Sequence, residues 1–182
     1  MGTSEGVGMT DKAEDSTPPS LGAALDGVPR EMLRNYRGDT QRPLTPGGRA
    51  LARVLALELE TRITTQSLGF RVGDEATAAK SVASLFGTVR THAAKAPADA
   101  KPVADLAVWM LNRHVRAYTA RWHGLAEKQV LSRADHSRRF RVELEELCQK
   151  LRVWCALFDG LAAGGDRTWP EGLGWPGAKP LA

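Results

Sequence analysis

The sequence predicts an all-α fold, a four-helix, mainly antiparallel bundle. Apolar residues recur at spacings of three and four along four long segments, which places them on one face of a helix. Short stretches marked by Gly and Pro separate these segments, and no segment alternates apolar and polar residues as a strand does. Helices of about twenty to thirty residues joined by short turns pack best as an antiparallel bundle.

The first helix is expected over residues 46–68, with Thr45 as its N-cap and Gly69 at its end. Its apolar face comprises Leu51, Val54, Leu55, Leu59 and Ile63. The second is expected over residues 74–95 and stops before Pro97. Its face comprises Val82, Leu85, Phe86 and Val89, and its many Ala residues allow a neighbouring helix to approach closely.

The third helix begins near Asp99, a suitable cap three residues before Pro102, and is expected to continue to Lys128. Its heptad seam consists of Val108, Leu111, Val115, Tyr118, Trp122 and Leu125. Tyr118 and Trp122 are therefore predicted to be core residues.

The fourth helix is expected to open at Ser132, which forms a capping-box-like pair with Asp135, and to end at Gly164 and Gly165. It carries the clearest pattern in the chain, with spacings of four and three over three heptads. The seam consists of Phe140, Leu144, Leu147, Leu151, Trp154, Phe158 and Leu161.

Composition indicates the domain boundaries. Residues 1–28 hold five acidic residues and one basic residue and are expected to form a disordered acidic leader. A short helix and linker, in which Pro29 suits a first helical position, occupy 29–44, and the bundle domain occupies 45–165. The tail, 166–182, repeats Trp-Pro and cannot be helical for long. Trp169 and Trp175 are expected to dock either on the bundle or on a partner.

The overall composition is that of an ordinary soluble protein, with 42% hydrophobic and 25% charged residues. No run of eighteen apolar residues occurs, so no membrane association is expected. The first twenty residues lack the features of a secretion signal, which predicts a cytoplasmic location. Abundant Ala, Gly and Arg with little Lys is typical of a GC-rich bacterial genome.

No residue pattern predicts a metal or another cofactor. The four His residues lack ligand spacing, and His114 and His123 are expected to flank the core. Cys148 and Cys155 are separated by about 10 Å of helix rise, too far for a mutual disulfide, and are expected to be reduced. No phosphate-binding loop or nucleophile elbow occurs.

Charge is unevenly distributed. Residues 113–152 hold ten basic and five acidic residues, a net charge of +5. Such a basic hairpin suits nucleic acid, an acidic partner surface or the acidic leader, although plain solubility also explains it. Several of these bases lie early in the fourth helix, where the helix dipole disfavours cations, which favours an anionic contact. The candidate anion- or partner-binding residues are Arg113, Arg121, Arg138, Arg139 and Arg141.

Arg116 and His123 lie seven apart on one helix face. An Arg followed by His after four to six residues resembles the motif of the HEPN superfamily, helical bundles that include metal-independent ribonucleases. The resemblance implies that Arg116 stabilises phosphoryl charge and that His123 acts as acid or base. Ala117 departs from the family, where a polar residue often follows the Arg, and a solvated face is the competing interpretation.

A second resemblance covers about fifty residues. Leu111-Asn112, Arg116 and Arg121-Trp122-His123, followed by Phe140-Arg141, Glu143-Leu144, Glu146-Leu147 and Leu151, resemble a pattern of small bacterial helical proteins, some of them linked to antiphage defence. Ala117 and Gly124 stand where that pattern often has Pro. The resemblance implies a structural hinge at Trp122 and His123, with Gly124 loosening the turn.

These observations together favour a non-enzymatic adaptor of a bacterial cytosolic system that acts by protein contact or as a homo-oligomer. The alternatives are a HEPN-like ribonuclease that uses Arg116 and His123, and a nucleic-acid binder without sequence preference.

Overall fold

The computed structural model describes residues 40–62, 74–128 and 133–164, together with Leu131 and six single positions between residues 25 and 38. Within these ranges the chain forms four helical segments and no strand, which confirms the predicted all-α class. The segments are α2 (Pro46–Glu60), α3 (Glu75–Lys95), a third that joins α4 (Lys101–Met110) to α5 (Arg116–Glu127), and α6 (Ala134–Ala162).

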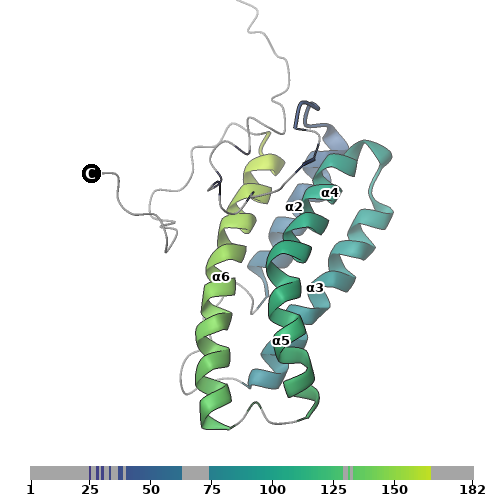
Figure 1. Cartoon of the computed structure of the whole chain (residues 1–182). Helices are drawn as coiled ribbons and strands as arrows, with labels where there is room; N and C mark the ends of the chain where they lie inside the picture. The colour runs from purple at the N-terminus through teal and green to yellow at the C-terminus, as the bar shows by residue number, and fades with distance from the viewer. Residues whose placement is uncertain are drawn as a thin grey trace, which may run out of the picture.

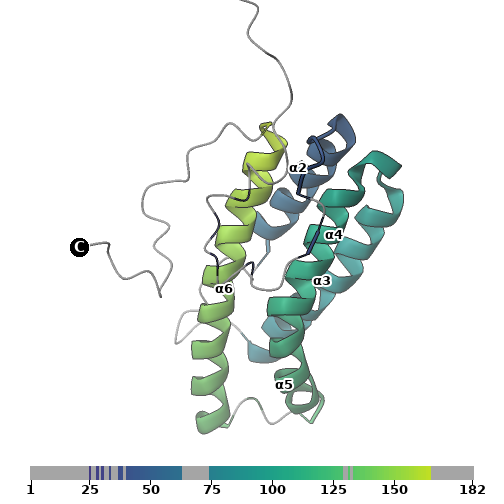
Figure 2. The same cartoon turned by 45° about the horizontal axis from the view of Figure 1, so that its top comes forward.

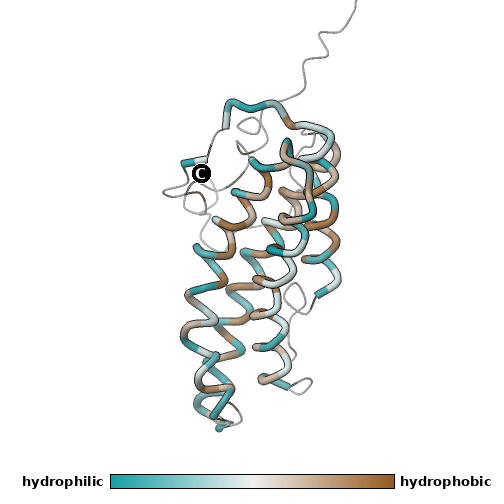
Figure 3. Tube along the Cα trace, turned by 90° about the vertical axis from the view of Figure 1, so that its right-hand side faces the viewer, coloured by the Kyte–Doolittle hydropathy of each residue, from teal (hydrophilic) through white to brown (hydrophobic). Residues whose placement is uncertain are grey.

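Successive segments run in opposite directions (Figures 1 and 2). The thiol of Cys155, near the end of α6, lies 3.5 Å from the carbonyl oxygen of Ala56 in α2, so these two helices lie side by side. At the other end of the bundle, Arg141 near the start of α6 contacts Glu75 at the start of α3. Hydrophobic positions recur along every helix between hydrophilic ones (Figure 3). The buried hydrophobic side chains form one core cluster.

Helix α2 is shorter than the sequence indicated. Thr45 accepts a hydrogen bond from the Gly48 amide as the predicted N-cap, but the helix ends at Glu60 rather than at Leu68. The Thr61 hydroxyl donates to the Leu57 carbonyl, and β-branched residues recur from Thr61 onward, which weakens helix propensity. Residues 63–73, including Ile63 and Gly69, lie outside the described residues.

Helix α3 begins and ends where the sequence predicted. The Asp74 carboxylate accepts a hydrogen bond from the Thr77 amide at 2.7 Å, and Lys95 is the last helical residue. Val82, Leu85 and Val89 are buried, whereas Phe86 is only partly buried. The partly exposed Phe86 ring lines a groove between α3 and α5.

The third segment is interrupted by one π-helical turn over Leu111–Val115. A π turn holds one more residue than an α turn, so the buried face shifts by one position across it. The predicted seam is correct for Leu111, Val115, Tyr118 and Trp122, all buried, but wrong for Val108, which is 45% exposed. Before the turn the buried positions are Val103, Leu106, Ala107 and Met110.

The start of this segment also differs from the prediction. Asp99 belongs to a 3-10 turn, Ala98–Ala100, and no side chain caps α4. The Asp99 carboxylate instead lies against Gly47 in the first turn of α2, where a β-carbon would overlap it. The Thr45 hydroxyl donates to the Asp99 carbonyl oxygen, so Asp99 holds α2 rather than starting α4.

Helix α6 confirms its predicted seam, since all seven residues from Phe140 to Leu161 are at most 3% exposed. The helix begins at Ala134 rather than at Ser132, and Arg133, at the N-cap position, makes no side-chain cap. Ser132 itself lies outside the described residues. Gly164, at φ 100°, ends the helix as predicted.

The predicted hinge at Trp122 and His123 is also wrong, because α5 continues through Gly124 to Glu127. Most of the leader, most of residues 29–39 and the tail from residue 165 lie outside the described residues, so Trp169 and Trp175 are not placed. Leu25 and Val28 are exceptions in the leader, and both are buried in the core. In the described part of the chain, no helix is long and apolar enough to cross a membrane.

Candidate functional site

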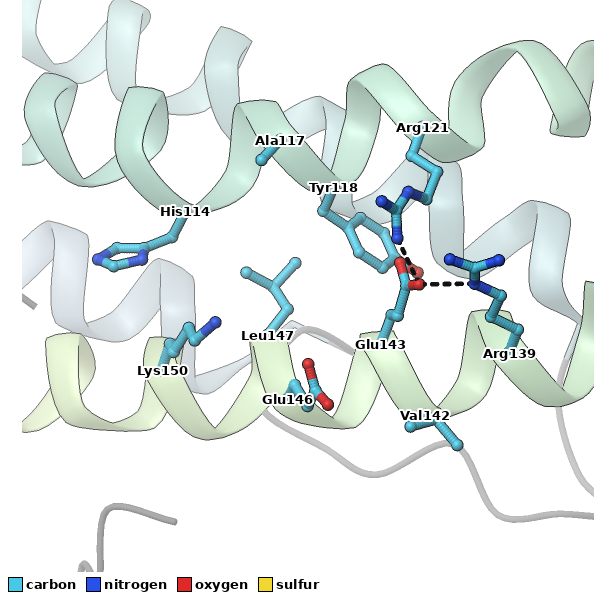
Figure 4. A pocket seen from close by; sticks show the side chains of 10 residues that line it. All are labelled: His114, Ala117, Tyr118, Arg121, Arg139, Val142, Glu143, Glu146, Leu147 and Lys150. Carbon is cyan, nitrogen blue, oxygen red and sulfur yellow. Dashed lines mark hydrogen bonds and ion pairs between the residues drawn. The ribbon is translucent and has the colours of Figure 1, made fainter. Parts of the chain in front are cut away.

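A groove with a volume of about 490 Å³ separates α5 from α6 (Figure 4). We call it the α5–α6 groove. Its floor is formed by buried Tyr118 and Leu147, Ala117 lines the α5 side, and Val142 lies at the outer edge of the α6 side (Figure 4). Charged side chains stand toward both ends of the groove. Its remaining lining residues are His114, Arg121, Arg139, Glu143, Glu146 and Lys150.

Two aromatic clusters pack the third helical segment against α6. At one level His114 and Trp109 pack against Trp154 of α6, with ring centroids 5.9–6.0 Å apart. At the other level Tyr118 and Trp122 pack against Phe140, with centroids 5.7 and 5.4 Å from it. Between these levels α5 presents only the methyl group of Ala117, opposite Leu147 (Figure 4).

Glu143 organises one end of the groove. Its carboxylate accepts hydrogen bonds from Arg121 at 2.6 Å, from Arg139 at 3.0 Å and from the Trp122 indole at 2.9 Å. Burial alone would raise the pKa of Glu143, but these hydrogen bonds outweigh burial and hold the pKa below its usual value. Two guanidinium groups share one carboxylate, so this end carries net positive charge.

A second carboxylate ties α6 to the start of α3. Glu75 accepts hydrogen bonds from the Ser137 hydroxyl at 2.6 Å and from Arg141 at 2.8 Å. The side chains of Arg141 and Glu75 are only 11% and 12% exposed. Burial would raise the pKa of Glu75, but the hydrogen bonds from Ser137 and Arg141 outweigh burial, and the pKa is lowered.

Three of the five candidate arginines contact carboxylates of the bundle itself, and these internal pairs were not among the predicted partners. Arg121 and Arg139 meet Glu143, and Arg141 meets Glu75. Arg113 and Arg138 are exposed, and Arg113 lines neither groove. Of the five predicted residues, the structure brings only Arg121 and Arg139 together in the α5–α6 groove.

Sequence reasoning missed the residues that shape this groove. Ala117 was noted only as a departure from known patterns, and Val142 and Lys150 were not singled out. Ala117 directly precedes the buried Tyr118, so it could have been expected to lie on the face toward α6. That expectation requires the position of the π turn, which shifts the register of the helix.

Arg116 and His123 lie in a different groove, of about 380 Å³, between α3 and α5. We call it the α3–α5 groove; it is also lined by Ala83, Phe86, Thr119, Ala120 and Gly124. The Arg116 guanidinium lies 5.6 Å from the centre of the Phe86 ring, and its Nε donates to Asn112 at 2.9 Å. His123 is 65% exposed, with its Nε2 3.2 Å from Glu127, so it does not flank the core, whereas His114 does.

The potential nucleophiles of the bundle are suppressed by burial. Burial raises the pKa of Cys148 to about 12 and that of Cys155 to about 11, so both thiols are protonated at neutral pH. Cys148 and Cys155 form no disulfide with each other, as predicted. Burial, together with the nearby Cys148 and Glu143, also raises the pKa of Tyr118. Among the described residues, no group of His, Cys, Asp and Glu is arranged to hold a metal ion.

Comparison with known proteins adds no relative: no protein-family model matches the chain, and no curated protein or solved structure is significantly similar to it. The groove geometry is therefore the basis for the functional proposal.

Acid should destabilise the protein through its paired carboxylates. The folded-state pKa values of Glu75 and Glu143 are lowered, and that of Glu58 is lowered chiefly by its hydrogen bond from Arg62. A lowered folded pKa stabilises the fold above the ordinary pKa of 4.5, and this contribution is lost as the pH falls below it. We expect the melting temperature to fall below about pH 4.5, and to fall less steeply in Glu143→Gln. Identical acid profiles for the two proteins would contradict the role of Glu143.

Proposed function

We propose that the chain is a non-enzymatic helical adaptor that binds a segment of a partner protein in the α5–α6 groove. One observation carries the proposal: two packed helices leave an open groove whose apolar floor lies between charged ends. Grooves of this kind receive peptide segments that insert apolar side chains and align polar ones at the rim.

The groove also indicates the chemistry of the partner segment. Val142 is 51% exposed at its outer edge, which is an unusual exposure for a large apolar side chain and suits an apolar contact. At one end Arg121 and Arg139 share Glu143, so a carboxylate of the partner is favoured there. Lys150 lies toward the other end and Glu146 lies beside Leu147, so this part of the groove offers one charge of each sign (Figure 4).

The composition and the resemblance to small bacterial helical proteins extend the proposal to an adaptor of a bacterial cytosolic system, of the kind linked to antiphage defence. Protonated thiols and arginines engaged by Glu75 and Glu143 support contact rather than catalysis.

A charged residue at Val142 should abolish partner binding. We expect proteins that co-purify with the native chain from its host to be lost from Val142→Arg at least about tenfold, because a bound partner would cover the exposed position 142 with an apolar side chain and leave the guanidinium without an opposing charge. Val108→Arg is the matched control, since Val108 is similarly exposed on α4, outside the groove. Equal recovery with both variants would contradict the proposal.

A second candidate function is a HEPN-like ribonuclease. The observation that favours it is that Arg116 and His123 line one concave surface, the α3–α5 groove. Because Arg116 already contacts Asn112 and Phe86, and His123 lies beside Glu127, we rank it below the adaptor.

The two functions separate in one assay. The purified protein and its His123→Ala and Arg116→Ala variants are incubated with labelled single-stranded RNA in EDTA. The adaptor predicts uncleaved RNA in every sample. Cleavage by the native protein that both variants lose would establish the ribonuclease instead.

A further inference from the structure

We propose that the α5–α6 groove is occupied by the chain's own residues 165–182, with the Trp175 indole between Ala117 and Leu147, until a partner segment displaces them. The inference rests on the proposed function, because that function identifies the groove as the docking site. It adds an occupant and a form of autoinhibition.

The reach of the chain allows this placement. The described chain ends at Gly164, directly after α6, the helix that forms one wall of the groove. Measured along α6, Lys150 lies about 21 Å and Val142 about 33 Å back from Gly164. The eleven residues from Gly164 to Trp175 span up to about 37 Å when extended, so Trp175 can reach the whole groove. The Cα atom of Trp169 can reach only about 17 Å, which leaves its indole short of Leu147, about 26 Å back along α6.

The chemistry of this segment complements the groove. An indole combines a large apolar surface with one donor, and the groove combines an apolar floor with charged ends. Its volume of about 490 Å³ falls in the range of pockets that bury ligands larger than an indole. Pro176 follows Trp175, which favours an extended backbone at the indole and lowers the entropy lost on docking. Glu171 lies within chain reach of Lys150.

The α3–α5 groove is the less suitable receptor. Its lining comes from α3 and α5, and none of it from α6. A segment that leaves the end of α6 would have to cross the full width of the third helical segment, about 10 Å, before it entered that groove. The same eleven residues would then not reach the end of the α3–α5 groove near His123 and Gly124.

Photo-crosslinking in the purified full-length protein tests the proposal. Ala117→p-benzoylphenylalanine places the reactive group in the groove, and Gly87→p-benzoylphenylalanine is the control, since Gly87 faces open space on α3. We expect an intramolecular adduct to residues 165–182 from position 117 but not from position 87. Adding Trp175→Ser should reduce its yield at least about fivefold, whereas Trp169→Ser should leave most of it.

The other outcomes overturn the inference. The first is a yield of tail adduct from position 117 no higher than the yield from position 87. The second is a yield that Trp175→Ser does not change. The third is a crosslinked dimer, which would assign the groove to a second copy of the chain. Repeating the experiment in cells separates this inference from the proposed function. If partner adducts form at position 117 without any to the tail, only the autoinhibition fails. If tail adducts form, but no adduct to a partner protein appears when Trp175→Ser frees the groove, the adaptor function fails.

Discussion

Trp154→Ala should lower the free energy of unfolding by about 3–5 kcal/mol, the loss typical of a large aromatic side chain removed from a core. Trp154 is completely buried and packs against Trp109, His114 and Phe158. Among the described residues its indole nitrogen has no hydrogen-bond partner, so the substitution removes packing and strands no polar group. Urea unfolding followed by circular dichroism measures the change.

Val108→Ala is the control for this prediction, because the sequence pattern assigned Val108 to the same kind of seam and the structure exposes it. We expect this variant to lie within about 0.5 kcal/mol of the native protein. A loss below about 1 kcal/mol for Trp154→Ala, or equal losses for both variants, would contradict the observed packing of α4 and α6.

Arg141→Met should cost about 3 kcal/mol, because it leaves the carboxylate of Glu75 largely buried and removes the cation that it contacts. The Ser137 hydroxyl remains as a donor to Glu75, but a hydroxyl does not neutralise the charge. The matched control is Arg138→Met, since Arg138 is an exposed arginine in the same turn of α6.

The double variant Glu75→Gln with Arg141→Met isolates the cause. If the uncompensated charge destabilises the single variant, neutralising Glu75 should restore more than half of the loss. Equal effects of Arg138→Met and Arg141→Met, or no rescue in the double variant, would mean that the Arg141–Glu75 pair is well solvated and contributes little.

Much of the fold follows from the sequence because one periodicity persists over long segments. The seam of α6 is correct at every position since the helix runs without interruption for 29 residues. The start of α3 is correct because Asp74 is a strong cap. Where the period breaks, as at the π turn over Leu111–Val115, a heptad extended backward places Val108 on the wrong face. Nothing in the local composition marks that turn.

The candidate site was predictable only in part. The excess of arginines in residues 113–152 led to a predicted contact with an external anion or partner, which stays a prediction, whereas the internal carboxylate partners of Arg139 and Arg141 depend on which helices meet. Glu143 is four residues after Arg139 and could have been anticipated as an i, i+4 pair. Glu75 lies 66 residues from Arg141, a separation that no local pattern bridges. The α5–α6 groove likewise arises from tertiary packing, because it depends on aromatic clusters at two levels and a small residue between them.

The adaptor proposal is tested most directly by photo-crosslinking in cells of the native host, with p-benzoylphenylalanine at Ala117 in the Trp175→Ser background and at Gly87 as the control. The proposal predicts adducts to a discrete protein at position 117, absent at position 87 and lost when Val142→Arg is added. Adducts to RNA, or protein adducts equal at both positions and indifferent to Val142→Arg, would contradict it.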